Sequence, residues 1–60
     1  MMDTLLKERK AATVISVAVQ TLRNRRSQGL PPKYVKIGKS VRYRPEDLRK
    51  FINDRVIDPK

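Results

Sequence analysis

The stretch that decides the fold covers residues 19–48, VQTLRNRRSQGLPPKYVKIGKSVRYRPEDL. Its first part predicts a basic helix over Val19–Ser27, because the 3.6-residue period turns Leu22 inward and leaves polar side chains outside. Gly29 suits the position just after a helix, and Pro31-Pro32 enforce the stop. The residues expected on the outer face are Gln20, Arg23, Asn24 and Ser27.

The second part of the stretch changes to a period of two residues, which predicts a two-stranded hairpin. The expected turn is Gly38-Lys39-Ser40. The apolar residues predicted to share one face are Val35, Ile37, Val41 and Tyr43, with Lys36, Arg42 and Arg44 on the other. A third helix is predicted from Pro45, with Glu46 and Asp47 in its first turn and an apolar stripe of Leu48, Phe51 and Ile52.

Upstream of this stretch, the pattern predicts another short helix from Lys7 to Ile15. Ala11 and Ala12 would let a second helix approach closely, and Val14, Ile15 and Val17 would supply most of the buried volume. Two short helices joined by a tight turn are typical of a helix-turn-helix. The predicted class is α+β: a single domain over 1–60, with an ordered core over about 5–55.

The charge is concentrated in one part of the chain. The 60 residues hold 15 Lys and Arg against 6 Asp and Glu, for a formal charge of +9. Residues 9–45 carry ten of these bases and no acid, whereas residues 1–8 sum to −1 and residues 46–60 to zero. An acid-free basic block inside an otherwise balanced domain indicates a polyanionic partner, the alternative being a basic surface kept for solubility.

The chemistry that the composition excludes is equally informative. The chain has no His and no Cys, so we expect no disulfide, no thiolate site, no metal and no cofactor. Glu46 and Asp47 are better explained by the helix dipole than by catalysis, so we do not expect an enzyme. The sequence shows no membrane span and no signal peptide, which leads us to expect a protein of the cytoplasm.

Several short motifs also carry a family resemblance. They are Leu5-Leu6 through Ala11-Ala12, Ser16-Val17, Thr21-Leu22-Arg23, Gly29-Leu30-Pro31-Pro32, Tyr34-Val35-Lys36-Ile37-Gly38, Val41-Arg42-Tyr43-Arg44 and Asp47-Leu48. Over residues 5–53 the chain resembles the small AlpA/excisionase-type winged helix-turn-helix proteins, which are related to the MerR DNA-binding domain. The resemblance implies a DNA-binding protein of phages and integrative elements. It would act in excision as a recombination directionality factor, or as a transcriptional regulator of an integrase, with the second helix in the major groove and the hairpin as the wing.

Four positions depart from that family's pattern. Lys7 and Ala18 stand where a capping Ser or Thr is usual, Ser16 replaces a turn glycine, and Arg25 replaces an aromatic residue. Asp3, Thr4 or Ser16 would cap the helices instead if these began earlier.

The side chains expected to contact DNA fall into three groups. Base edges would be read by Gln20, Arg23, Asn24 and Val19, since an amide pairs with adenine, a guanidinium with guanine and an apolar group with a thymine methyl. Backbone contacts are expected from Thr21, Arg25, Arg26, Ser27, Lys33 and Lys36. The wing would contribute Lys39, Ser40, Arg42 and Arg44.

Other partners remain open at this stage. One alternative is a small basic RNA-binding protein, although the chain has only three aromatic residues and no evident stacking platform. Another is an adaptor for an acidic protein surface, for instance a tyrosine integrase. One short helix recognises few base pairs, so we expect a monomer in solution that assembles cooperatively on repeated DNA sites and bends them.

Overall fold

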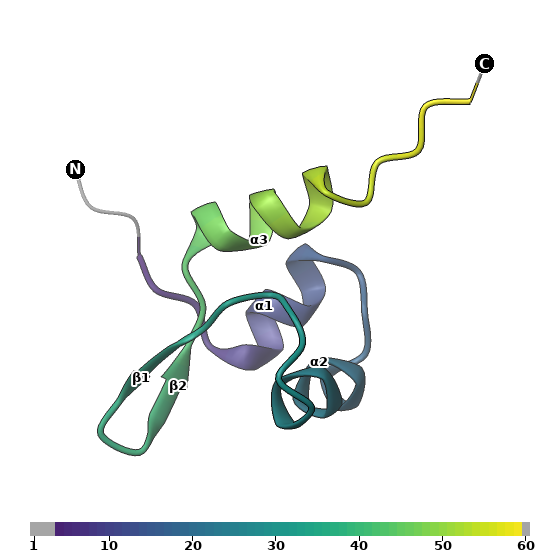
Figure 1. Cartoon of the computed structure of the whole chain (residues 1–60). Helices are drawn as coiled ribbons and strands as arrows, with labels where there is room; N and C mark the ends of the chain where they lie inside the picture. Colours follow the sequence, from purple (N-terminus) through teal and green to yellow (C-terminus); the bar gives the residue numbers. More distant parts are fainter. Residues whose placement is uncertain (1–3, 60) are drawn as a thin grey trace.

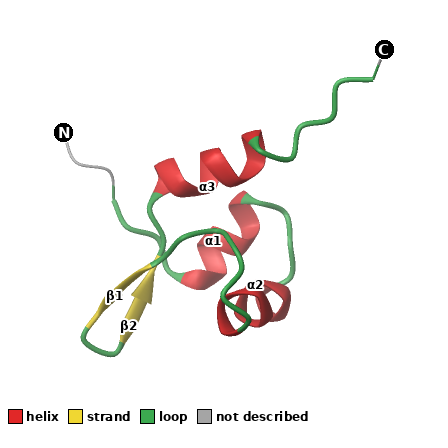
Figure 2. Ribbon diagram, in the orientation of Figure 1, coloured by secondary structure: helices red, strands yellow, loops and turns green. Residues whose placement is uncertain are grey.

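The computed structural model describes residues 4–59 and contains three helices and one antiparallel hairpin, an α+β arrangement (Figures 1 and 2). The elements are α1 (Glu8–Val14), α2 (Val19–Ser27), β1 (Val35–Ile37), β2 (Ser40–Arg42) and α3 (Pro45–Asn53). Helix α1 packs against both α2 and α3, and the hairpin projects away from α3 (Figure 1). The order and type of the elements agree with those predicted from the sequence.

The core joins all three helices to the end of the hairpin. Its largest fully buried side chains are Leu22 from α2, Leu48 from α3 and Tyr43, which follows β2. Ala11 and Ala12 are also buried, so the small face predicted for α1 is the one its neighbours approach. Val14 is exposed, which corrects the prediction that it fills the core. The buried stripe of α1 is centred on the alanines, and each residue advances by about 100° around the helix, so Val14 falls outside it.

Both N-terminal helices end in the same hydrogen-bonded turn. The N–H of Val17 donates to the carbonyl of Ala12 at 2.9 Å, and the N–H of Leu30 donates to that of Arg25 at 2.8 Å. This pattern is the Schellman motif, which requires a left-handed residue just after the helix. Gly29 fills that position after α2 with φ 72°, as predicted, and Ser16 fills it after α1 with φ 61°. A serine therefore holds a conformation that favours glycine.

The starts of the same helices carry no side-chain caps. Lys7 and Ala18 are the N-cap residues, both extended, and neither makes a capping hydrogen bond through its side chain. Since α1 and α2 do not begin earlier than predicted, Thr4 and Ser16 do not replace them as caps. Asp3 lies outside the described residues.

The register of the hairpin differs from the predicted one. Its loop consists of Gly38 and Lys39 alone, and Ser40 already pairs with Ile37. Glycine at the first position of a two-residue loop, here with φ 60°, is typical of a type II′ turn. A loop shortened from three residues to two shifts the pairing by one residue, and such a shift moves every side chain of one strand to the other face.

Two faces of mixed character result from this register. Lys36 lies opposite Val41, and Val35 opposite Arg42, so no single face collects all the apolar residues. Of the residues predicted to form one apolar face, Ile37 is 57% exposed, whereas Tyr43 is buried. The Tyr34 ring lies 6.3 Å from the Tyr43 ring, as expected for side chains on one face.

The two ends of the hairpin segment are tied into the rest of the molecule. Leu6 and Tyr43 exchange two backbone hydrogen bonds of 2.8 Å, so the segment before α1 pairs with the residue after β2. Helix α3 begins with Pro45 and buries Leu48 and Phe51. Ile52, predicted to share their stripe, is exposed, because α3 packs mainly against α1 and buries only a narrow face.

Candidate nucleic-acid interface

Helix α2 presents a polar surface around its single fully buried residue, Leu22. The predicted reading residues Gln20 and Asn24 are exposed one turn apart, and Gln20 Nε2 donates to Asn24 Oδ1 at 3.0 Å. This bond leaves Gln20 Oε1 and Asn24 Nδ2 free to pair with a base edge. Val19 is half-buried and packs against the core, so its apolar surface is largely used inside the protein. Thr21 and Ser27 are exposed, as a backbone contact requires.

Arg23, the predicted guanine reader, is joined to an acid from another helix. Its Nε and Nη2 donate to Glu8 Oε1 at 2.9 and 2.6 Å. Arg26 Nη1 donates to the other oxygen, Oε2, at 3.2 Å, and to the buried Tyr43 hydroxyl at 3.4 Å. The hydrogen bond from Arg23 lowers the pKa of Glu8 below its ordinary value, with the Arg26 bond acting in the same direction. Glu8 is therefore ionised at neutral pH, and one carboxylate organises two of the predicted DNA contacts.

Arg25 contributes to packing. Its Nε donates to the Pro31 carbonyl at 2.6 Å, and its guanidinium carbon lies 5.1 Å from the centre of the Phe51 ring. Arg55 covers the same ring at 3.7 Å. Arg25 thus links the end of α2 to α3, in the place where the family resemblance leads one to expect an aromatic side chain. Its guanidinium is already engaged in the two interactions named here.

Arg44 does not lie on the wing, which corrects its predicted placement. It is the N-cap residue of α3, and its Nε and Nη2 donate to the two oxygens of Asp47 at 2.6 and 3.0 Å. This bidentate pair raises the pKa of Arg44 and neutralises its charge locally. The physical reason is the turn of the chain after Tyr43, which carries Arg44 from the hairpin to the start of α3.

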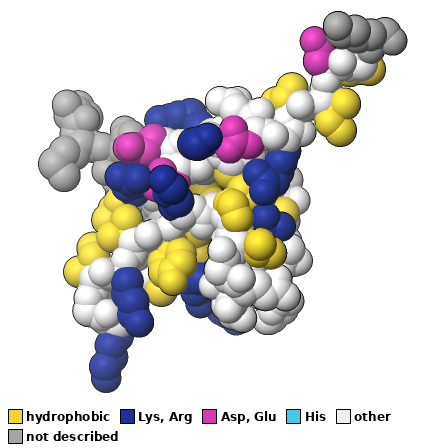
Figure 3. All heavy atoms as spheres, in the orientation of Figure 1, with side chains coloured by type: hydrophobic (Ala, Val, Ile, Leu, Met, Phe, Trp, Pro, Cys, Tyr) yellow, Lys and Arg dark blue, Asp and Glu magenta, His cyan; other side chains and the backbone are white. Residues whose placement is uncertain are grey.

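The hairpin keeps its cations unpaired. Lys36 and Lys39 are exposed and have no acidic partner among residues 4–59, and Ser40 beside them is exposed as well. Arg42 is half-buried and donates to the Val41 carbonyl at 2.8 Å. This carbonyl is uncharged, so the charge of Arg42 has no counter-ion among residues 4–59. Figure 3 shows Lys and Arg side chains along the projecting hairpin, and a mixture of acidic and basic side chains over α3.

A hollow of about 410 Å³ lies between the hairpin and the helices, and it carries several cations. Its lining residues are Lys7, Glu8, Arg26, Lys39, Ser40, Val41 and Arg42. The sequence marks Lys7 only as a position that lacks a capping side chain, whereas the fold brings its charge into the same hollow as the predicted wing contacts. The periodicity of the sequence gives no signal for this arrangement, because it depends on the pairing of Leu6 with Tyr43, which brings the segment before α1 to the end of the hairpin.

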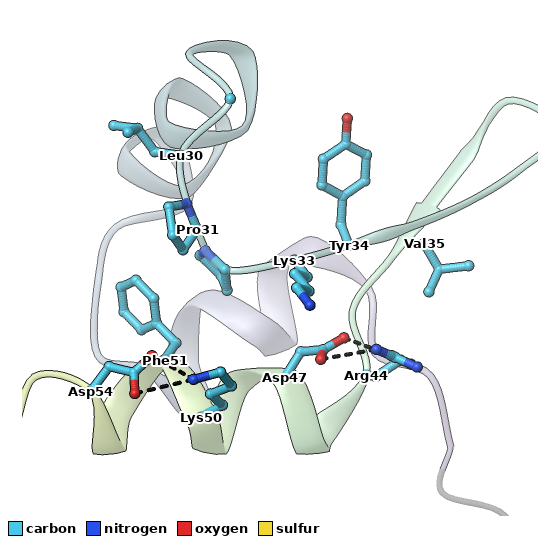
Figure 4. A pocket seen from close by; sticks show the side chains of 12 residues that line it. Leu30, Pro31, Lys33, Tyr34, Val35, Arg44, Asp47, Lys50, Phe51 and Asp54 are labelled. Atoms are coloured by element: carbon cyan, nitrogen blue, oxygen red, sulfur yellow. Dashed lines mark hydrogen bonds and ion pairs between the residues drawn. The ribbon is translucent and has the colours of Figure 1, made fainter.

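A second hollow, of about 490 Å³, separates the 29–35 loop from α3. Figure 4 shows Phe51 rising from α3 toward the loop, and two ion pairs on the α3 side, Lys50 with Asp54 and Arg44 with Asp47. Lys33, predicted as a backbone contact, lines this hollow and not the basic one. It is thus separated from the cations gathered on the hairpin.

Comparisons of the chain with protein-family models, curated proteins and solved structures find no match. Residues 4–59 contain no cluster of three side chains able to hold a metal ion. None of the three helices in that range has the length and apolar character needed to cross a membrane.

Proposed function

We propose that this protein binds duplex DNA, with α2 in the major groove and the hairpin on the neighbouring sugar-phosphate backbone. The observation that carries the proposal is the placement of charge. Helix α2 and the hairpin project on the same side of the molecule, away from α3 (Figure 1). Four of the six acids, Glu46, Asp47, Asp54 and Asp58, belong to α3 or the segment after it. A polyanion is therefore attracted to the side formed by α2 and the hairpin.

The side chains on that side suit two kinds of contact. Gln20, Asn24 and Arg23 carry the amides and the guanidinium that recognise adenine and guanine in the major groove. Lys36 and Lys39 are exposed point charges, which position a protein on phosphates without distinguishing sequences. Helix α2 would thus supply specificity and the hairpin general affinity.

Within DNA binding, the AlpA/excisionase resemblance favours a recombination directionality factor that binds and bends attachment-site DNA. A transcriptional regulator of an integrase gene is the second candidate. An excision assay with and without the protein, beside its neighbouring integrase, separates the two roles. Excision that depends directly on the protein supports the first, and an effect only on integrase transcript level supports the second.

Electrophoretic retardation of short duplexes at several salt concentrations tests the proposal itself. The logarithm of the binding constant is expected to fall by about 0.9 per log unit of salt for each phosphate neutralised. Lys39→Ala should lower this slope by about one and weaken all sequences alike. Lys50→Ala removes the same charge from α3, where Lys50 pairs with Asp54, and should leave the slope nearly unchanged. Salt-insensitive binding, or equal effects of the two variants, would contradict the proposed interface.

Competition with single-stranded RNA decides between duplex DNA and the RNA alternative. Of the three aromatic residues, Tyr43 and Phe51 are buried and Tyr34 is exposed, so a platform of several aromatic rings is lacking among residues 4–59. We therefore expect RNA to compete poorly. RNA that displaces the duplex at equal concentration would favour the alternative.

A further inference from the structure

Glu8 occupies an unusual position in the charge pattern of this protein. It is the only acid between positions 4 and 45, and it faces two arginines from α2. Its side chain is 27% exposed, so it lies partly under the surface that α2 presents. The helix proposed to recognise the DNA sequence therefore has a carboxylate placed against two of its cations.

The geometry leaves Arg23 with one free bidentate edge. A planar guanidinium has five N–H donors, arranged so that Nε with Nη2 forms one edge and Nη1 with Nη2 forms the other. Glu8 Oε1 accepts from Nε at 2.9 Å and from Nη2 at 2.6 Å, which occupies the first edge. The Arg23 side chain remains 49% exposed. Fixing one edge of a rigid plane fixes the direction of the other, which matches the paired acceptors O6 and N7 of guanine.

The charge of Glu8, like its position, favours the contact of Arg23 with a guanine over a contact with a phosphate. A phosphate approaching Arg23 or Arg26 would meet a carboxylate that already holds both guanidiniums, and the two anions repel each other. A guanine edge is neutral and meets no such repulsion. Glu8 is thus expected to weaken phosphate contacts by these arginines while leaving the base contact of Arg23 intact.

We infer that Glu8 is a positioning residue that commits Arg23 to a guanine edge and keeps it from phosphates, so that it raises sequence discrimination and lowers general affinity. The inference rests on the proposed binding of duplex DNA and adds to it a residue outside α2. Glu8 itself touches no base in this arrangement and acts through Arg23.

The experiment compares Glu8→Gln with Glu46→Gln. Both variants remove one negative charge, but Glu46 lies on α3, is 59% exposed, and is 3.8 Å from its partner Arg44. The probes are duplexes that the wild-type protein selects from a random-sequence pool, the same duplexes with each guanine replaced in turn by 7-deazaguanine, and a scrambled duplex. Retardation assays then give affinities for every probe at two salt concentrations.

For wild-type protein, loss of N7 at one guanine should weaken binding by about 5- to 150-fold, the range for one bidentate base contact. In Glu8→Gln, the ratio of the affinities for the guanine duplex and its 7-deazaguanine counterpart should fall to about threefold or less. This variant should also bind the scrambled duplex several-fold more tightly than the wild type does, with a steeper salt slope. Arg23→Lys should lose the ratio as well. Glu46→Gln should keep it.

A second measurement covers the case in which Glu8→Gln does not fold. The Nε–H of Arg23 in wild-type protein, followed by NMR in the free state and in the duplex complex, should exchange with water more slowly than that of Arg9, which has no acidic partner among residues 4–59. Equal exchange in the complex, or full retention of the ratio by Glu8→Gln, would overturn the inference. If wild-type protein shows no salt-dependent duplex binding at all, the proposed function itself fails and the inference with it.

Discussion

Ser16, the residue after α1 with a left-handed backbone conformation, allows the backbone strain at this turn to be measured by substitution. Ser16 has φ 61° and is exposed, and its hydroxyl makes no hydrogen bond within residues 4–59. A residue with a Cβ is disfavoured in this conformation by about 1–2 kcal/mol relative to glycine. The gain in unfolded-state freedom caused by glycine offsets about 0.4–1 kcal/mol of this. Ser16→Gly should therefore stabilise the domain by about 0.5–1 kcal/mol.

The reciprocal substitution uses the matching turn after α2. Gly29 has φ 72°, and a Cβ added there meets no atom within 4 Å, so Gly29→Ser introduces backbone strain without a clash. We expect it to destabilise the domain by about as much as Ser16→Gly stabilises it. In a domain of this size, 1 kcal/mol changes Tm by roughly 4–8 °C.

The assay is thermal and urea unfolding followed by far-UV circular dichroism, with Ser16→Ala as the control. Alanine removes the hydroxyl but keeps the Cβ, so it should leave the Tm close to that of the wild type. Equal Tm values for Ser16→Ala and Ser16→Gly would refute the attribution of strain to the backbone. An unchanged Tm for Gly29→Ser would refute it independently.

Three further predictions concern a cap, an ion pair and the core. Ala18→Ser should stabilise the domain by about 1 kcal/mol, because Ala18 already has the extended N-cap conformation and the new hydroxyl can accept from the Thr21 N–H; an unchanged urea midpoint would contradict this. Arg23 lowers the pKa of Glu8 from its ordinary 4.5, so the unfolded chain takes up the proton first on acidification. The stabilising contribution is present above about pH 4.5 and is lost as the pH falls through the lowered pKa. The urea midpoints of wild type and Glu8→Gln should accordingly differ at neutral pH and converge as the pH falls through the lowered pKa, and a difference that stays constant throughout acidification would be inconsistent with the ion pair. Leu48→Ala should cost about 2–5 kcal/mol, enough to leave so small a domain largely unfolded by circular dichroism, and a Tm close to that of the wild type would argue against Leu48 as a core residue.

The sequence is most informative where structure depends on neighbouring residues. Helix α2 has the predicted bounds, and Gly29 adopts the predicted left-handed conformation, because both follow from a local period and a local stop signal. The hairpin lies where it was predicted, but its two faces carry different residues from those predicted. A loop one residue shorter shifts the pairing of the strands by one residue. The exposed Ile52 has a similar origin: the width of a helix's buried stripe depends on how many elements pack against it.

The candidate site depends more strongly on contacts between distant residues. Exposure of Gln20 and Asn24 followed from the helical period, whereas the contact of Glu8 with Arg23 joins residues 15 positions apart and has no periodic signal. The same holds for Arg25, whose partners Pro31 and Phe51 lie beyond α2. A charge count treats all ten bases of the 9–45 block alike, but the fold engages some of them internally and leaves the hairpin lysines exposed.

The pairing of Leu6 with Tyr43 has a consequence for how the domain folds. Two backbone hydrogen bonds join Leu6, before α1, to Tyr43, after β2. Helices α1 and α2 and the hairpin therefore all lie within one closed loop of chain. The core on which this loop closes also needs Leu48, from outside it. No fragment of the chain therefore contains a complete core of its own. Folding should occur in a single all-or-none step, and the most protected backbone amides of α1, α2 and α3 should exchange with solvent at the same global opening rate.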